Sequence, residues 1–127
     1  MAQIINTSLI IGFGGFIGTI FRFLISSLIE KSFATSFPIG TLLVNLIGCF
    51  LIGLVSGYFI QKMGDQTQLF FFLTIGILGG FTTFSAIAID SQLFIENGEF
   101  LKMLLYITTQ IIVGITLCLI GYNFMKN

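Results

Sequence analysis

The stretch Gly79-Gly80-Phe81-Thr82-Thr83-Phe84-Ser85 lies near the middle of an apolar run that extends from about Leu69 to Ile95. A run of this composition favours a continuous helix, but each of two adjacent glycines lowers helix stability by roughly 1 kcal/mol relative to alanine. The hydroxyl side chains that follow can bond to loosened backbone groups. We therefore expect the helix to break here, leaving two halves over about Leu69–Leu78 and Thr83–Ile95.

The composition of the chain is that of an integral membrane protein. Of the 127 residues, 56% are hydrophobic and only 8% are charged, and the mean hydropathy is +1.10. A bilayer core about 30 Å thick takes about 20 helical residues to cross. The length predicts an all-α protein whose residues 1–127 form one four-helix transmembrane domain with short connections.

The expected spans are separated by short polar segments. The spans are about Ile4–Ile29, Ile39–Ile60, the interrupted Leu69–Ile95 and Leu101–Phe124, and the connections are Glu30–Pro38, Gln61–Gln68 and Glu96–Glu99. Histidine, the commonest proton shuttle, is absent, and no pair of nucleophile and base is recognisable. We therefore expect no enzymatic activity.

A break in the third span, near the bilayer midplane, suggests an ion site. Non-helical backbone at membrane depth is tolerated only where protein buries it or where it faces a watery cavity. Amino termini of half-helices attract anions there, and exposed carbonyls coordinate cations. The backbone carbonyls of Gly79 and Thr82 would suit a hard cation such as sodium.

Hydrogen-bond donors and one aromatic ring are spaced through the middle of the expected domain. Asn45 needs partners, which either a neighbouring helix or a permeating solute would supply. Thr83 and Ser85 offer hydroxyls, and the positive edge of the Phe84 ring can solvate a small anion. Arg22 either reaches to the membrane interface or lines an aqueous vestibule. The residues favour a small-ion channel.

Other small or polar residues in the spans are expected to serve packing. Four glycines at helical spacing predict close helix contacts: Gly14, Gly18, Gly53 and Gly57. Cys49 and Cys118 are interpreted as small packing residues. Asp90 is either a carboxylate near the interface or a proton-coupled group. Gln110 belongs to a weakly polar stripe of the fourth span.

The distribution of positive charge gives no preferred orientation. Lys62 and Lys126 lie on one side of the expected membrane, Lys31 and Lys102 lie on the other, and Arg22 adds at most one charge to the bias. We therefore expect dual topology. Because four short helices do not enclose a pore, we expect an antiparallel dimer about a two-fold axis in the membrane plane.

With these segments in view, the whole chain resembles the fluoride channels of the Fluc (CrcB) family. The likeness rests on Gly14–Gly18 followed by Arg22, on Gly40–Gly48 with Asn45, and on the Gly79–Ser85 stretch. The resemblance implies a dual-topology dimer in the prokaryotic plasma (inner) membrane that lets fluoride leave the cytoplasm passively through two pores. It implies partners limited to fluoride, the lipid bilayer and a second copy or a homologous subunit, with no nucleic acid.

The resemblance also implies roles for individual residues. Gly79 and Thr82 would hold a structural Na+, which is not transported, through their backbone carbonyls at the dimer centre. Fluoride would pass Asn45 and the edge of Phe84, with hydroxyls such as that of Ser85 nearby.

The sequence departs from the family pattern at three positions. Ile87 stands where the family usually has a second phenylalanine, and Gly114 and Cys118 stand where hydroxyl residues are usual. The chain is then either a homodimer with a simplified pore or the degenerate, non-conducting subunit of an unlike pair. A small multidrug-type proton-coupled transporter is the rival from another class, but such a transporter needs a deep carboxylate and the first span has none.

Overall fold

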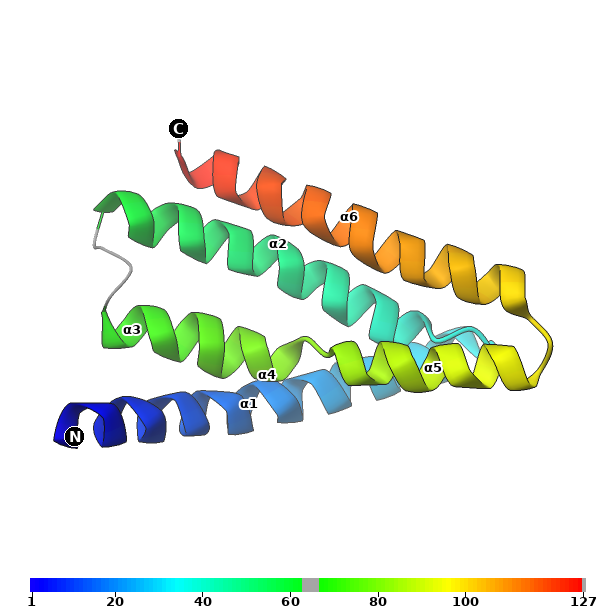
Figure 1. Cartoon of the computed structure of the whole chain (residues 1–127), viewed down its shortest axis with the longest axis horizontal. Coiled ribbons are helices and arrows are strands. Elements are labelled where there is room, and N and C mark those ends of the chain that lie inside the picture. Colours follow the sequence, from blue (N-terminus) through cyan, green and yellow to red (C-terminus); the bar gives the residue numbers. More distant parts are fainter. Residues whose placement is uncertain (63–66, 127) are drawn as a thin grey trace.

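The computed structural model describes residues 1–62 and 67–126, and the only regular elements within them are helices. These are α1 Ala2–Phe33, α2 Ile39–Lys62, α3 Gln68–Phe71, the π-helix η1 Phe72–Leu78, α4 Gly79–Phe81, α5 Phe84–Glu96 and α6 Phe100–Lys126. The long helical segments run alongside one another, and both ends of the chain lie toward the same end of the bundle (Figure 1).

Four helical segments of the described chain are long and apolar enough to cross a membrane. They are Ala2–Phe33, Ile39–Lys62, Gln68–Glu96 and Phe100–Lys126. The prediction of an all-α protein with four spans is confirmed, although α1 continues one turn beyond the expected end at Ile29. The predicted loop Gln61–Gln68 lies partly outside the described residues.

The backbone of the third segment is extended at two residues between α4 and α5 (Figure 1). Thr82 has φ −86° and ψ 155°, and Thr83 has φ −151° and ψ 124°. Gly79 and Gly80, where the sequence reasoning places the loss of helix, are themselves helical in α4. The π-helix η1, just before them, has no counterpart in the sequence prediction.

The glycines next to this interruption serve helix packing, because α1 lies very close to η1 and α4. A Cβ atom on Gly18 would lie 2.0 Å from the carbonyl oxygen of Ile77, and one on Gly80 would lie 2.6 Å from that of Gly15. Only a residue without a side chain fits at such distances. The predicted close contacts are confirmed at all four glycines: Gly14, Gly18, Gly53 and Gly57.

A small apolar core joins α5 to α6 near the connection between them. It contains Ile87, Phe94, Met103 and Tyr106, with Phe37 packed against it. The rings of Phe37 and Tyr106 meet edge to face, with centroids 5.6 Å apart. Most other large apolar side chains of α1 and α6 point outward, as expected for helices that face lipid.

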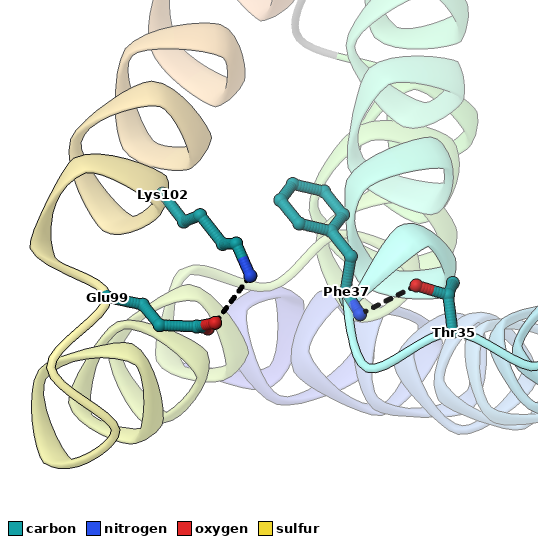
Figure 2. Close-up of polar contacts among 4 residues, drawn as sticks. All are labelled: Thr35, Phe37, Glu99 and Lys102. Carbon is teal, nitrogen blue, oxygen red and sulfur yellow. Dashed lines mark hydrogen bonds and ion pairs between the residues drawn. The ribbon is translucent and has the colours of Figure 1, made fainter.

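Polar contacts close the connections at this end of the bundle (Figure 2). Lys102 forms an ion pair with Glu99, three residues earlier at the start of α6. In the connection from α1 to α2, the backbone N–H of Phe37 donates to the hydroxyl of Thr35 over 3.1 Å. Both contacts are exposed, so they fix local turns and add little to the free energy of unfolding.

Candidate functional site

The interruption between α4 and α5 is held by the side chain of Asn45 on α2. The Asn45 amide oxygen accepts from the backbone N–H of Thr83 over 2.8 Å, and its Nδ2 donates to the carbonyl of Thr83 over 3.0 Å. Asn45 is only 6% exposed. The predicted need for a partner is thus met in part within the chain, and the second N–H of Nδ2 has no protein acceptor in the described residues.

Hydroxyl groups complete the turn into α5. The Thr83 hydroxyl accepts from the backbone N–H of Ala86 over 3.2 Å, so Thr83 is the N-cap of α5. It also lies 3.0 Å from the hydroxyl of Ser85. The Thr82 hydroxyl instead donates back to the carbonyl of Leu78 over 2.9 Å. The predicted hydroxyl residues are therefore gathered at the start of α5.

This arrangement leaves the backbone carbonyls of Gly79, Phe81 and Thr82 without a hydrogen-bond donor in the described residues, whereas that of Gly80 accepts from the Thr19 hydroxyl over 3.5 Å. In a continuous helix the N–H of Thr83 would bond to the Gly79 carbonyl, but here it bonds to Asn45. The N–H of Ala86 would bond to the Thr82 carbonyl, but here it bonds to the Thr83 hydroxyl. The oxygens of Gly79 and Thr82, which the sequence predicts as cation ligands, are thus free for a hard cation. Among the described residues, no three side chains of His, Cys, Asp or Glu are grouped for a metal.

A groove of about 420 Å³ lies between α2, the interruption, α5 and α6. It brings together six of the residues predicted from the sequence and four others, namely Asn45, Gly79, Thr82, Thr83, Phe84 and Ile87, with Cys49, Ile107, Gln110 and Ile111. We call it the α2–α6 groove. Phe84 is 76% exposed, whereas Ile87 is 8% exposed and is also part of the α5–α6 core.

The remaining predicted residues face a second hollow of about 450 Å³, which we call the α1–α5 hollow. Arg22 and Ser85 lie there with the hydroxyl residues Thr19, Ser26 and Thr41, and Thr83 lines both cavities. The sequence prediction placed these residues on one path. Within a single chain the structure instead divides them between two open hollows on either side of Thr83.

Gln110 on α6 is a polar residue of the groove that the sequence reasoning did not assign to the site. It is 7% exposed and lines the α2–α6 groove. Its Nε2 forms no hydrogen bond of standard geometry in the described residues, although the amide lies near the Tyr106 hydroxyl. A buried donor without a partner is costly, so it indicates a place for an acceptor. The weakly polar stripe of the fourth span was the available signal.

Asp90 is engaged by a neighbouring helix. The Tyr106 hydroxyl donates to an Asp90 carboxylate oxygen over 2.7 Å, and Tyr106 is almost completely buried on α6. The carboxylate therefore lies against α6 at one end of the α5–α6 core. This contact does not decide between the two roles expected for Asp90.

Comparison with known proteins places these features in a family. A family model described as "CrcB-like protein, Camphor Resistance (CrcB)" matches residues 9–122. The chain is 39% identical over 112 residues to a protein of Aquifex aeolicus (strain VF5), covering 88% of this chain and 90% of that protein.

Two further relatives have similar coverage. A protein of Campylobacter jejuni subsp. jejuni serotype O:23/36 (strain 81-176) is 43% identical over 115 residues, 91% of this chain and 90% of its own. One of Rhizobium meliloti (strain 1021) is 35% identical over 121 residues, 95% of this chain and 97% of its own. All three relatives are named "Fluoride-specific ion channel FluC", and none of these names describes a multidrug transporter. Because the family model matches nearly the whole sequence, the chain belongs to the CrcB family.

Proposed function

We propose that this chain forms a fluoride-selective channel, through which fluoride leaves the cell passively down its gradient and its toxicity is reduced. The three relatives named as fluoride-specific channels match the chain almost from end to end. The structural observation that carries the proposal is the α2–α6 groove, which the Gln110 amide and the exposed Phe84 ring line beside the interruption. A channel subunit of this kind is not an enzyme.

The groove offers the hydrogen-bond donors that a small anion requires when it loses its bound water. Fluoride is a hydrogen-bond acceptor, and burying an ion without compensating partners is very costly. The Nε2 of Gln110 and the second N–H of Asn45 are available donors, and the positive edge of the Phe84 ring can add to them. Ser85 and Arg22 extend the polar lining into the α1–α5 hollow.

We also propose a structural Na+ at the interruption, bound by the backbone carbonyls of Gly79 and Thr82. Both oxygens are available to an ion because the backbone N–H groups of Thr83 and Ala86 donate to side chains instead. Carbonyl oxygens are suitable ligands for a hard cation. When bound, the ion would supply a fixed positive charge beside the anion path and would satisfy two oxygens at membrane depth.

The working channel is proposed to be an antiparallel dimer with its interruptions near the bilayer midplane. Each cavity in one chain is an open groove, so a second copy is needed to close a path. The equal numbers of lysines on the two sides permit both orientations. The outward apolar side chains of α1 and the exposed Phe84 offer surface to a second copy.

Ion flux from liposomes tests the proposed function. Purified chain reconstituted alone should release trapped fluoride and should retain trapped chloride. Empty liposomes are the control for leakage. Equal release of both anions would contradict selectivity, and no fluoride release from the chain alone would contradict a homodimeric channel.

A further inference from the structure

One aromatic ring packs on the α5–α6 core from outside both helices. Phe37 belongs to the connection between α1 and α2, and its ring is directed toward α6 (Figure 2). The centroid of this ring lies 5.7 Å from that of Phe94 on α5 and 5.6 Å from that of Tyr106 on α6. The rings of Phe94 and Tyr106 are themselves 5.8 Å apart, so each ring contacts the other two. We call these three residues the aromatic triad.

The backbone of the connection holds Phe37 on both sides. Its N–H donates to the Thr35 hydroxyl over 3.1 Å, and its carbonyl accepts from the N–H of Ile39, the first residue of α2, over 2.8 Å. Phe37 also precedes Pro38, which restricts the φ and ψ angles open to it. The ring of Phe37 therefore starts from a fixed point, although it belongs to a connection.

Tyr106 is the member of the aromatic triad that contacts polar groups. It is 1% exposed, and its hydroxyl donates to Asp90 on α5. Gln110 lies one turn further along the same face of α6 and is also buried. Because the single Tyr106 proton is given to Asp90, the Tyr106 oxygen can only accept from the nearby Gln110 amide. The place of the Tyr106 ring thus affects where the Gln110 donor lies.

The aromatic triad also lies behind the wall of the α2–α6 groove. Ile87 belongs to the same apolar core and lines the groove, and Ile107, which is packed against that core, lines the groove as well. Protein interiors are densely packed, so the displacement of one ring is felt by its neighbours. A change at Phe37 should therefore reach the groove through the residues between them.

We propose that Phe37 is a positioning residue for the anion path. It holds the Tyr106 ring against Phe94 and so fixes the hydroxyl that bonds to Asp90. The same hydroxyl oxygen orients the Gln110 amide, whose remaining N–H then faces the groove. This role rests on the proposed fluoride channel. Core packing alone explains why an apolar side chain occurs at Phe37, but it does not predict that its loss changes a hydrogen bond of α6.

The Tyr106 hydrogen bond can be measured without any ion flux. The chain has three tyrosines and no tryptophan, so Tyr58→Phe with Tyr122→Phe leaves Tyr106 as the only tyrosine. Ultraviolet resonance Raman then reports, from the intensity ratio of the tyrosine doublet, how strongly this hydroxyl donates. Asp90→Ala in this background is the reference for a lost acceptor, and Phe37→Ala should shift the ratio toward that reference. An unchanged ratio in Phe37→Ala would overturn the positioning role.

Ion flux measures the effect on the path. Phe37→Ala should slow fluoride efflux from liposomes by roughly three- to tenfold, because the hydrogen bond from a displaced donor is weakened rather than removed. In a Gln110→Leu chain the same change should slow efflux by less than about twofold more, since two residues that act through one group are not additive. Fully additive losses, or native efflux in Phe37→Ala, would contradict the proposal. Phe37→Leu keeps most of the apolar volume and should give intermediate values in both measurements, and it replaces Phe37→Ala if that variant does not fold.

A matched ring at the other end of the bundle separates positioning from a simple loss of stability (Figure 1). Phe70 on α3 is also half-buried and also contacts two rings, those of Phe59 and Phe71, with centroids 5.6 and 6.0 Å away. Phe70→Ala should lower the thermal midpoint but leave the Tyr106 signal and fluoride efflux unchanged. Equal slowing of efflux in Phe70→Ala and Phe37→Ala would overturn a specific role. If the native chain releases no fluoride, the channel proposal fails, and the Raman comparison alone decides whether Phe37 positions Tyr106.

Discussion

At the residue scale, Asn45 is the side chain on which the geometry of the interruption depends. Its amide takes both backbone groups of Thr83 and so leaves the Gly79 carbonyl free. The Thr82 carbonyl is left free for another reason, because the Thr83 hydroxyl takes the N–H of Ala86. Sequence reasoning identifies Asn45 as a polar group in hydrocarbon that needs a partner. It does not identify Thr83 as that partner, because the pairing joins residues 38 positions apart and depends on how α2 packs.

Replacing Asn45 by aspartate should stop fluoride conduction. A fixed negative charge a few ångströms from an anion path repels the anion by about 4 kcal/mol at an effective dielectric constant near 20, so efflux should fall at least about a hundredfold. Asp also cannot donate to the Thr83 carbonyl. Liposome efflux measures the change, and native-like efflux in Asn45→Asp would remove Asn45 from the path.

Replacing Gln110 by leucine should separate conduction from stability. Hydrogen bonds to charged groups contribute about 1.5–3 kcal/mol, so loss of the donor should slow fluoride efflux by roughly ten- to a hundredfold. The thermal midpoint should be unchanged or higher, because an unpaired buried donor is removed. The control is Thr108→Val on the exposed face of α6, and slowed efflux in that variant would contradict a specific role for Gln110.

At the element scale, the connection between α4 and α5 shows what sequence reasoning can and cannot locate. Adjacent glycines and hydroxyl residues identify the correct seven-residue neighbourhood, since these residue types weaken helices locally. Gly79 and Gly80 nevertheless remain helical, and the extended residues are Thr82 and Thr83. The difference is tertiary: Gly80 is needed for contact with α1, and Asn45 draws the Thr83 backbone out of the helix.

Replacing sodium by another cation tests whether the free carbonyls between α4 and α5 bind Na+. If Na+ binds there, replacing it on both sides of the membrane by a large organic cation should lower fluoride efflux, because the nearby fixed positive charge is lost. Restoring Na+ should restore efflux. Equal efflux in the two salts after prolonged dialysis would argue against the ion.

The packing of α1 on the third segment should be sensitive to a single methyl group. In Gly18→Ala the new Cβ would lie 2.0 Å from the Ile77 carbonyl oxygen, and overpacking of this kind typically costs about 1–3 kcal/mol. Gly12→Ala is the matched control on the same helix, because nothing lies within 4 Å of its Cβ position. Thermal unfolding in detergent should show a lower midpoint for Gly18→Ala only. Equal midpoints would contradict the close contact.

At the scale of the whole molecule, composition predicts most of the architecture. Four apolar runs and three short connections lead to four spans, since lipid leaves few alternatives to a helix. Hydropathy does not reveal which residues share a cavity. Arg22 and Ser85 face one hollow while Asn45 and Phe84 face another, and Gln110 joins the site through the packing of α6 on α2.

Charge variants that fix the orientation should test the antiparallel dimer. Ser36→Arg with Asn97→Arg adds two charges on one side, and Gln61→Arg with Asn123→Arg adds two on the other. Each double variant should be inactive alone, and the two together should restore fluoride efflux in co-expressing cells. Full activity of either variant alone would mean that a parallel arrangement suffices.

The π-helix η1 has a consequence for how this chain tolerates changes in length. A π-helical turn contains about one residue more than the α-helical turn that it replaces. The seven residues Phe72–Leu78 thus carry a surplus residue immediately before the carbonyls of Gly79 and Thr82. Removal of the exposed Ile75 would let this segment relax to an ordinary α-helix, and each later residue would stay on the same side of its helix. Natural homologues one residue shorter should have their gap in this turn.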